Sequence, residues 1–143
     1  MTTDRSEIFL EGEAVGGCLC GAVRFAVAPG PIVESGYCHC RTCQRQSGAP
    51  VVAFFAVAPD RFRYQLGEAA GYRASAFATR EFCSTCGTYL VFREDDASAT
   101  VSVNTATLDD PTRVPPLYHI YVESRVCWFD TKDDLPRFRR GRS

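Results

Sequence analysis

Larger apolar side chains fall at every second position early in the chain, where Val23, Phe25 and Val27 stand between smaller or polar residues. Successive side chains of a β-strand point to opposite faces, so this period predicts a strand with one buried face. Residues 51–57 form a continuous apolar run instead. A run of that length predicts a central strand that is covered on both faces.

Other short segments rich in strand-forming residues predict strands at 32–38, 72–82, 88–92, 99–103 and 117–122. Glycine and proline interrupt the pattern, as in Pro29-Gly30-Pro31. A short helix is expected only at residues 43–47. Evenly spaced short strands with such interruptions are typical of a mainly β domain.

The chain has 143 residues, 45% of them hydrophobic, and a formal net charge of −1. Its length is typical of one domain, so we expect residues 1–143 to form a single domain. The nearly neutral charge argues against a nucleic-acid partner. Residues 1–13 are predicted to be a loose or edge-pairing arm, and the basic residues 137–143 a solvated tail.

Residues 1–7 are polar and lack the apolar core of a signal peptide. No apolar run approaches the ~20 residues that a helix needs to cross a bilayer. We therefore expect a cytoplasmic protein without a membrane partner. The cytosol keeps thiols reduced, so the cysteines of such a protein are available for metal binding.

Seven of the eight cysteines lie in three tight clusters, which are Cys18/Cys20, Cys38/Cys40/Cys43 and Cys83/Cys86. Spacings of two and three residues suit metal binding, because one tight turn then aims neighbouring sulfurs at a single point. Zinc takes four protein ligands in a closed structural site and three in an open, reactive site. Seven thiols therefore favour two zinc ions per chain over structural disulfides.

The spacing leaves open how the clusters combine. The two outer pairs can join, which would tie the first predicted strand to the late hairpin that turns at Cys83–Gly87 and would stabilise the fold directly. The local triple Cys38, Cys40 and Cys43 would then keep one tetrahedral position free. In the other arrangement, the triple combines with one of the pairs.

Three further residues have candidate chemistry. His39 lies between two cysteines, but neighbouring residues of an extended chain point to opposite sides, so we expect it to face away from a metal and to form hydrogen bonds. His119 is predicted to be a packed, hydrogen-bonded histidine of a strand. Cys127, outside the clusters, is predicted to be a small buried apolar side chain.

Five motifs in order resemble the glutathione-dependent formaldehyde-activating enzyme family, which includes centromere protein V. They are Gly17-Cys18-Leu19-Cys20-Gly21, the Cys38–Gln44 stretch with Ser47-Gly48, the Phe82–Gly87 knuckle, Thr107–Pro111, and His119-Ile120 with Trp128-Phe129. The resemblance extends from about residue 16 to residue 138. Because the motifs keep their order across nearly the whole chain, the chain is identified as a member of this family.

The resemblance implies a β-tent, in which zinc pins antiparallel sheets as in R-specific methionine sulfoxide reductases. It implies that Cys18, Cys20, Cys83 and Cys86 bind a structural zinc, and that the triple binds a catalytic zinc. It also implies the condensation of glutathione with formaldehyde, which is a carbon–sulfur lyase reaction in reverse. A small thiol substrate is therefore expected.

Charge considerations point to substrate-binding residues near the triple. Three thiolates give a zinc site a charge of −1, so basic neighbours would help it to accept another thiolate. Arg41 and Arg45 are adjacent in sequence and are predicted to meet substrate carboxylates, and Asn104 is predicted to line the pocket. The alternatives to an enzyme are a zinc-stabilised binding module and a thiol redox sensor.

Overall fold

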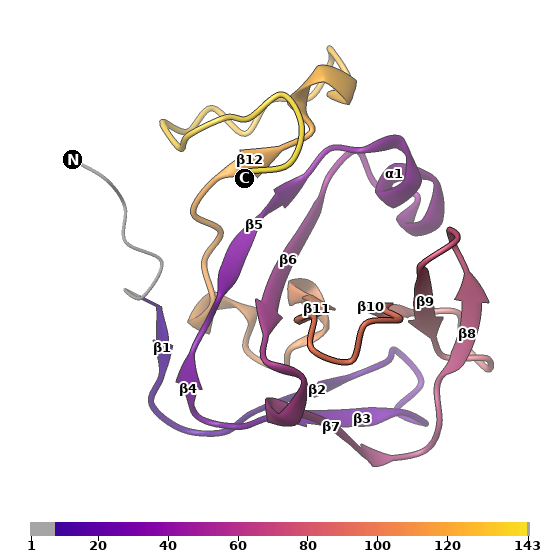
Figure 1. Ribbon diagram of the computed structural model, residues 1–143. Helices are drawn as coiled ribbons and strands as arrows, with labels where there is room; N and C mark the ends of the chain where they lie inside the picture. Colours follow the sequence, from indigo (N-terminus) through magenta and orange to yellow (C-terminus); the bar gives the residue numbers. More distant parts are fainter. Residues whose placement is uncertain (1–7, 143) are drawn as a thin grey trace.

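A computed structural model of the protein describes residues 8–142 and contains a seven-stranded sheet with the order β12-β5-β6-β11-β10-β9-β8. Its strands are β5 (Glu34–Cys38), β6 (Val52–Val57), β8 (Ala70–Arg73), β9 (Ala78–Phe82), β10 (Tyr89–Glu94), β11 (Val101–Asn104) and β12 (His119–Ile120). Neighbouring strands are antiparallel except β12, which runs parallel to β5 (Figure 1). The mainly β prediction is confirmed.

Two smaller antiparallel sheets complete the strand set. They are formed by β2 (Ala14–Gly17), β3 (Arg24–Val27) and β7 (Phe62–Leu66), and by β1 (Phe9–Leu10) with β4 (Gly30–Pro31). The only α-helix within the described residues is α1 (Arg41–Ser47), in the place where the sequence predicts one. The 3-10 turns are η2 (Pro59–Arg61), η3 (Thr105–Thr107), η4 (Pro111–Arg113) and η5 (Val122–Ser124).

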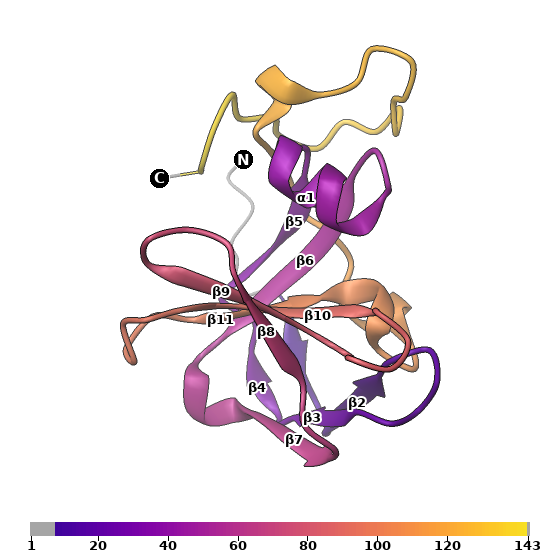
Figure 2. The same ribbon diagram turned by 90° about the vertical axis from the view of Figure 1, so that its right-hand side faces the viewer.

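The main apolar core lies between the three-stranded sheet and one face of the seven-stranded sheet. Phe25 and Val27 of β3 face Phe55 and Val57 of β6 across this core. In both views the three-stranded sheet lies on the side away from α1 and the C-terminal segment (Figures 1 and 2). The other face of the large sheet is therefore left to α1 and the C-terminal segment.

Strand β6 is apolar on both faces, as its continuous run predicts. Phe55 and Val57 belong to the main core, whereas Val52 and Phe54 belong to a second, smaller cluster with Cys38 and Cys43. Antiparallel β5 and β11 flank β6 and complete its hydrogen bonding. The centre of the sheet is thus fixed by burial on two sides.

Two strand predictions are wrong in extent. Residues 72–82 form two antiparallel strands, β8 and β9, because the chain reverses at Ala74, whose N–H donates to the carbonyl of Ala78 (3.1 Å). Small apolar residues made this turn resemble a strand interior. Residues 117–122 contain only the two-residue β12, because Tyr121 takes a left-handed backbone conformation with φ of 58° and ends it.

Strand β7 was not predicted, although Phe62, Tyr64 and Leu66 recur with the period of a strand. Strand β2 was missed as well, because two of its four residues are glycine. The predicted N-terminal arm pairs at a sheet edge through β1, and Leu10 is buried in the main core. The remainder of that arm, residues 1–7, lies outside the described residues.

The basic C-terminal segment is solvated, as predicted, in that the side chains of Arg139 and Arg140 are exposed, but backbone hydrogen bonds and ion pairs also hold it against the protein. Arg139 and Arg140 both bind Glu123 (3.1 Å), and Arg142 lies over the ring of Tyr118. Ser143 lies outside the described part. No helix in residues 8–142 has the length and apolar character that are needed to cross a membrane.

Gly16 offers a test of how closely the three-stranded sheet approaches the following loops. It bridges to Leu108, and a Cβ atom there would overlap the carbonyl oxygen of Thr107 and lie 2.7 Å from Cζ of Phe25. We expect Gly16→Ala to lower the free energy of unfolding by about 1–3 kcal/mol in urea denaturation. Gly12→Ala, where a Cβ would meet nothing within 4 Å, is the control. Equal stability of the two variants would contradict the packing described.

Candidate metal centres and active-site cavity

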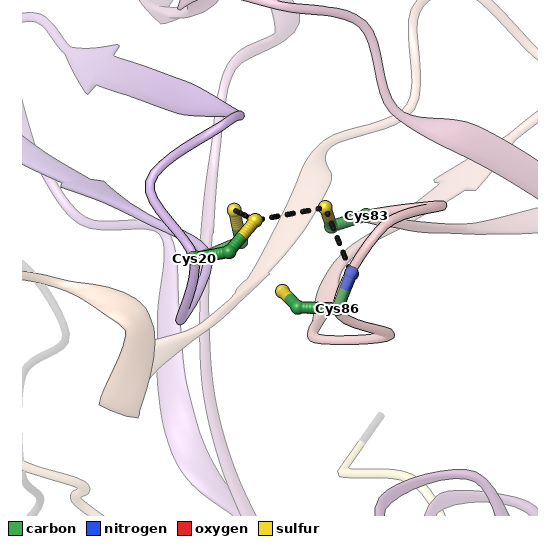
Figure 3. Close-up of side chains that lie close together, drawn as sticks. Cys20, Cys83 and Cys86 are labelled. Carbon is green, nitrogen blue, oxygen red and sulfur yellow. Dashed lines mark hydrogen bonds between the residues drawn. The ribbon is translucent and has the colours of Figure 1, made fainter.

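Four cysteines from distant parts of the chain meet at the edge of the main core. Cys18 and Cys20 follow β2, while Cys83 and Cys86 lie in the turn between β9 and β10. Their Sγ atoms all lie within 4.8 Å of one another. The Sγ atoms of Cys18 and Cys20 are 3.7 Å apart, and those of Cys20 and Cys83 are 3.8 Å apart (Figure 3).

These separations fit a tetrahedral zinc site. A Zn–S distance of about 2.3 Å gives a sulfur–sulfur edge of about 3.8 Å in a tetrahedron. Backbone amides donate hydrogen bonds to two of the sulfurs: Val23 donates to Cys18 (3.2 Å) and Cys86 donates to Cys83 (3.5 Å). Hydrogen bonding to the Thr88 side chain and backbone lowers the pKa of Cys86 to about 5. The donor set therefore suits a closed zinc site.

The four-cysteine group connects the two sheets that enclose the core. One pair belongs to the loop between β2 and β3 of the three-stranded sheet, and the other to the β9–β10 turn of the large sheet. Cys18 and Cys83 are themselves buried in the main core. A metal ion bound here would cross-link the two sheets at the edge of the core.

Cys38, Cys40 and Cys43 form the second group, on the opposite face of the large sheet. Cys38 ends β5, Cys40 is the N-cap of α1, and Cys43 lies in that helix. Their Sγ atoms also lie within 4.8 Å of one another. The backbone N–H of Cys43 donates to Sγ of Cys40 (3.3 Å), so one short turn fixes the relative position of the sulfurs.

The three thiols are electrostatically coupled. Hydrogen bonds from Cys38 and Cys43 lower the pKa of Cys40 to about 2, and the same contact with Cys40 raises the pKa of Cys38. The three thiols therefore ionise as a coupled set and not independently. A bound metal ion deprotonates coordinated thiols outright, so this set suits a three-thiolate zinc site with a fourth position free.

Arg80 of β9 reaches this group and was not among the predicted site residues. Its two terminal nitrogens lie 3.6 and 3.5 Å from Sγ of Cys43, and Nη1 donates to Oε1 of Gln46 (2.8 Å). The guanidinium lies over the rings of Tyr89 and Phe92, at 5.4 and 5.2 Å from their centroids. Arg80 is only 7% exposed, so its charge acts in a poorly solvated environment.

The environment of Arg80 favours its charged form. Burial alone would lower the pKa of Arg80, but its electrostatic interactions with Tyr89 and Cys43 outweigh this effect and raise the pKa above its ordinary value. The contact joins residues 37 positions apart. The only signal in the sequence is an arginine three residues before Cys83 in a segment that is otherwise suited to a strand.

A cavity of about 420 Å³ opens beside the three cysteines. The cysteines, Arg80 and several hydroxyl side chains form its polar part, and the walls are mainly apolar, with contributions from Val52, Phe54 and Phe92. The cavity borders the second cluster, on the face of the large sheet opposite the main core. A small molecule bound there would contact the thiols directly and be shielded from water by the aromatic rings.

The predicted substrate-binding residues lie elsewhere. Arg41 binds Oε1 of Gln44, Arg45 is exposed on α1, and Nδ2 of Asn104 donates to the carbonyl of Tyr89 (3.0 Å). None of the three lines the cavity beside the cysteines. A role for them in substrate binding stays a prediction, and the structure brings Arg80 to that position instead.

The two histidines are buried and hydrogen-bonded, as the sequence predicts. Nε2 of His39 lies 2.8 Å from Nδ1 of His119, and Nε2 of His119 lies 3.1 Å from the carboxylate of Asp133. Burial, and then the proximity of His119, lowers the pKa of His39 to about 4. His39 therefore links β5 to the C-terminal segment.

The prediction for Cys127 is wrong, because this residue is exposed. The neighbouring Trp128 is 74% exposed, so the segment that follows η5 lies on the surface. The prediction rested on the frequent burial of free cysteines, but the C-terminal segment packs through other residues.

Comparisons with known proteins agree with this geometry. The model of a family described as glutathione-dependent formaldehyde-activating enzyme matches residues 13–124. An uncharacterized lyase of Schizosaccharomyces pombe is 37% identical over 82 residues, which are 56% of this chain and 57% of that protein. The crystal structure of a Rhodobacter sphaeroides protein has 27% identity and a TM-score of 0.52, and covers 66% of this chain and 87% of that one.

The two cysteine groups are expected to bind metal independently. We predict two zinc ions per wild-type chain by elemental analysis, and one in Cys40→Ser with little change in thermal unfolding. Cys83→Ser should lose one ion and unfold at a much lower temperature, because binding at the four-cysteine group contributes to folding. The exposed Cys127→Ser is the control and should match wild type. Loss of both ions in Cys40→Ser would contradict two separate sites.

Proposed function

Because the chain belongs to the glutathione-dependent formaldehyde-activating enzyme family, we propose that it is a zinc-dependent carbon–sulfur lyase. Its reaction would join a thiol such as glutathione to formaldehyde or another small electrophile. The lyase name of the yeast relative supports this reaction type. The observation that carries the proposal is a group of three cysteines that faces a cavity and is separate from the group of four.

The proposed reaction takes place at the three cysteines. A zinc ion held by Cys38, Cys40 and Cys43 would supply one open position, where a substrate thiol loses its proton. The thiolate is the reactive nucleophile. Its sulfur would attack the carbonyl carbon of formaldehyde, the C–S bond would form, and the C=O π electrons would move to oxygen, which takes up a proton. The apolar walls would hold the reactants together, and proximity supplies much of the rate enhancement.

Arg80 supports the charge balance of this reaction. Three thiolates leave Zn²⁺ with a charge of −1, and the buried guanidinium beside Cys43 returns the local sum to zero. A bound substrate thiolate would then bring the local charge to −1, whereas without Arg80 it would be −2. A cavity of this size favours an enzyme acting on small molecules over a module that only binds a protein partner.

Catalysis can be tested by following adduct formation between glutathione and formaldehyde with exchange NMR. We expect an exchange rate that rises in proportion to the concentration of zinc-loaded protein and is lost in Cys40→Ser. A rate equal to the uncatalysed rate at every protein concentration would refute the proposed activity.

Substitution of Arg80 tests its electrostatic role separately from metal binding. We expect Arg80→Met to weaken glutathione binding roughly tenfold, as for the loss of one charged hydrogen-bonding group. Arg80→Lys should restore part of the affinity, and zinc content should not change. The measurement is calorimetric titration of the zinc-loaded protein, with Arg63→Met, on the other sheet, as the control. Unchanged affinity in Arg80→Met would exclude this role.

A further inference from the structure

A second cavity, of about 450 Å³, continues from the first along the same face of the large sheet. The two cavities share Phe54, Ser102 and Ile120 in their linings. The first cavity contains the three cysteines, and the second contains Glu34, Tyr118 and Arg142. Together they form a groove with the three cysteine thiols at one end and the side chains of Glu34 and Arg142 at the other.

Strand β5 sets the length of this groove. It begins at Glu34 and ends at Cys38, and the even spacing places both side chains on the same face of the sheet. Four residues of a strand span about 13 Å. A molecule bound through sulfur at Cys38, Cys40 and Cys43 must therefore extend by several bonds before it can contact Glu34.

The far end of the groove presents opposite charges side by side. Nε of Arg142 lies 3.5 Å from Oε1 of Glu34, and the guanidinium lies over the ring of Tyr118 at 4.4 Å from its centroid. The hydroxyl of Tyr118 binds the carboxylate of Glu34. Within residues 8–142, Nε of Arg142 is buried and forms no regular hydrogen bond.

Such a pair suits a ligand that carries both an ammonium and a carboxylate group. The side chains of Glu34 and Arg142 are 32% and 21% exposed, so their mutual attraction is partly screened by water. A ligand carboxylate can bind a guanidinium in a planar, two-point contact, and an ammonium group can bind the neighbouring carboxylate. A ligand that is already anchored through its sulfur can form these contacts in place of the Glu34–Arg142 contact at a small cost in binding entropy.

We propose that the second cavity binds the zwitterionic end of a peptide-like thiol whose sulfur lies at the three cysteines. This inference rests on the proposed function, because it assumes that a thiol binds in the first cavity. Three extended residues span at most about 10–11 Å, which, with the reach of the side chains of Glu34 and Arg142, matches the groove. A single amino acid thiol carries the same charged groups but is too short to reach them.

The test compares glutathione with free cysteine, which keeps the thiol, ammonium and carboxylate but lacks the length. Both are titrated calorimetrically into the zinc-loaded full-length protein. We expect wild type to bind glutathione at least roughly tenfold more tightly than cysteine, the effect of one or two charged hydrogen bonds. Arg142→Met and Glu34→Gln should each remove most of this preference and leave the affinity for cysteine unchanged.

Arg139→Met is the matched control, because it removes a nearby arginine that pairs with Glu123 and does not line either cavity. It should keep the wild-type preference. Equal affinities for the two thiols in wild type, or a preference that survives both substitutions, would overturn the inference and leave the proposed function standing. Failure of both thiols to bind would refute the proposed function, and the inference with it. Thermal unfolding of each variant checks that the fold is intact.

Discussion

The meeting of Cys18 and Cys20 with Cys83 and Cys86 fixes the relation between the two sheets, and much of the molecule depends on it. The two pairs come from loops on different sheets, so their approach defines how closely the sheets pack around the core. The turn that carries Cys83 and Cys86 also ends β9. Arg80 lies on that strand three residues before Cys83, so the closed group also helps to place the cation that contacts the open one.

The seven-stranded sheet separates stability from chemistry by face. One face packs against the three-stranded sheet and carries the main core, while the other carries the three cysteines and both cavities. Strand β6 serves both faces, because alternate side chains enter the core or the cavities. Substitutions of β6 at Phe55 or Val57 act on the core, whereas those at Phe54 act on the site.

The cysteine clusters of the site could be predicted from the sequence, because their members are only two or three residues apart. Pairs and triples within a turn could be recognised directly, but the joining of the two outer pairs depends on sheet packing, which spacing leaves open. Arg80 was missed for the same reason, since its contact with Cys43 exists only after β9 and α1 are brought together. Arg41 and Arg45 show the converse situation, because they are neighbours of the cysteines in sequence but do not line the cavity.

The hydrogen bond between His39 and His119 bears on how easily each cysteine group is exposed by local unfolding. His119 and Asp133 tie the C-terminal segment to the turn that carries Cys38 and Cys40, outside the main core. Regions with few core contacts open locally at a lower free energy than the core itself. Cys18 and Cys83 belong to the main core, whereas Cys38 belongs to the smaller cluster and Cys40 packs against it. We therefore expect a metal ion at the three cysteines to exchange without unfolding of the whole protein, and one at the four cysteines to exchange only with the core.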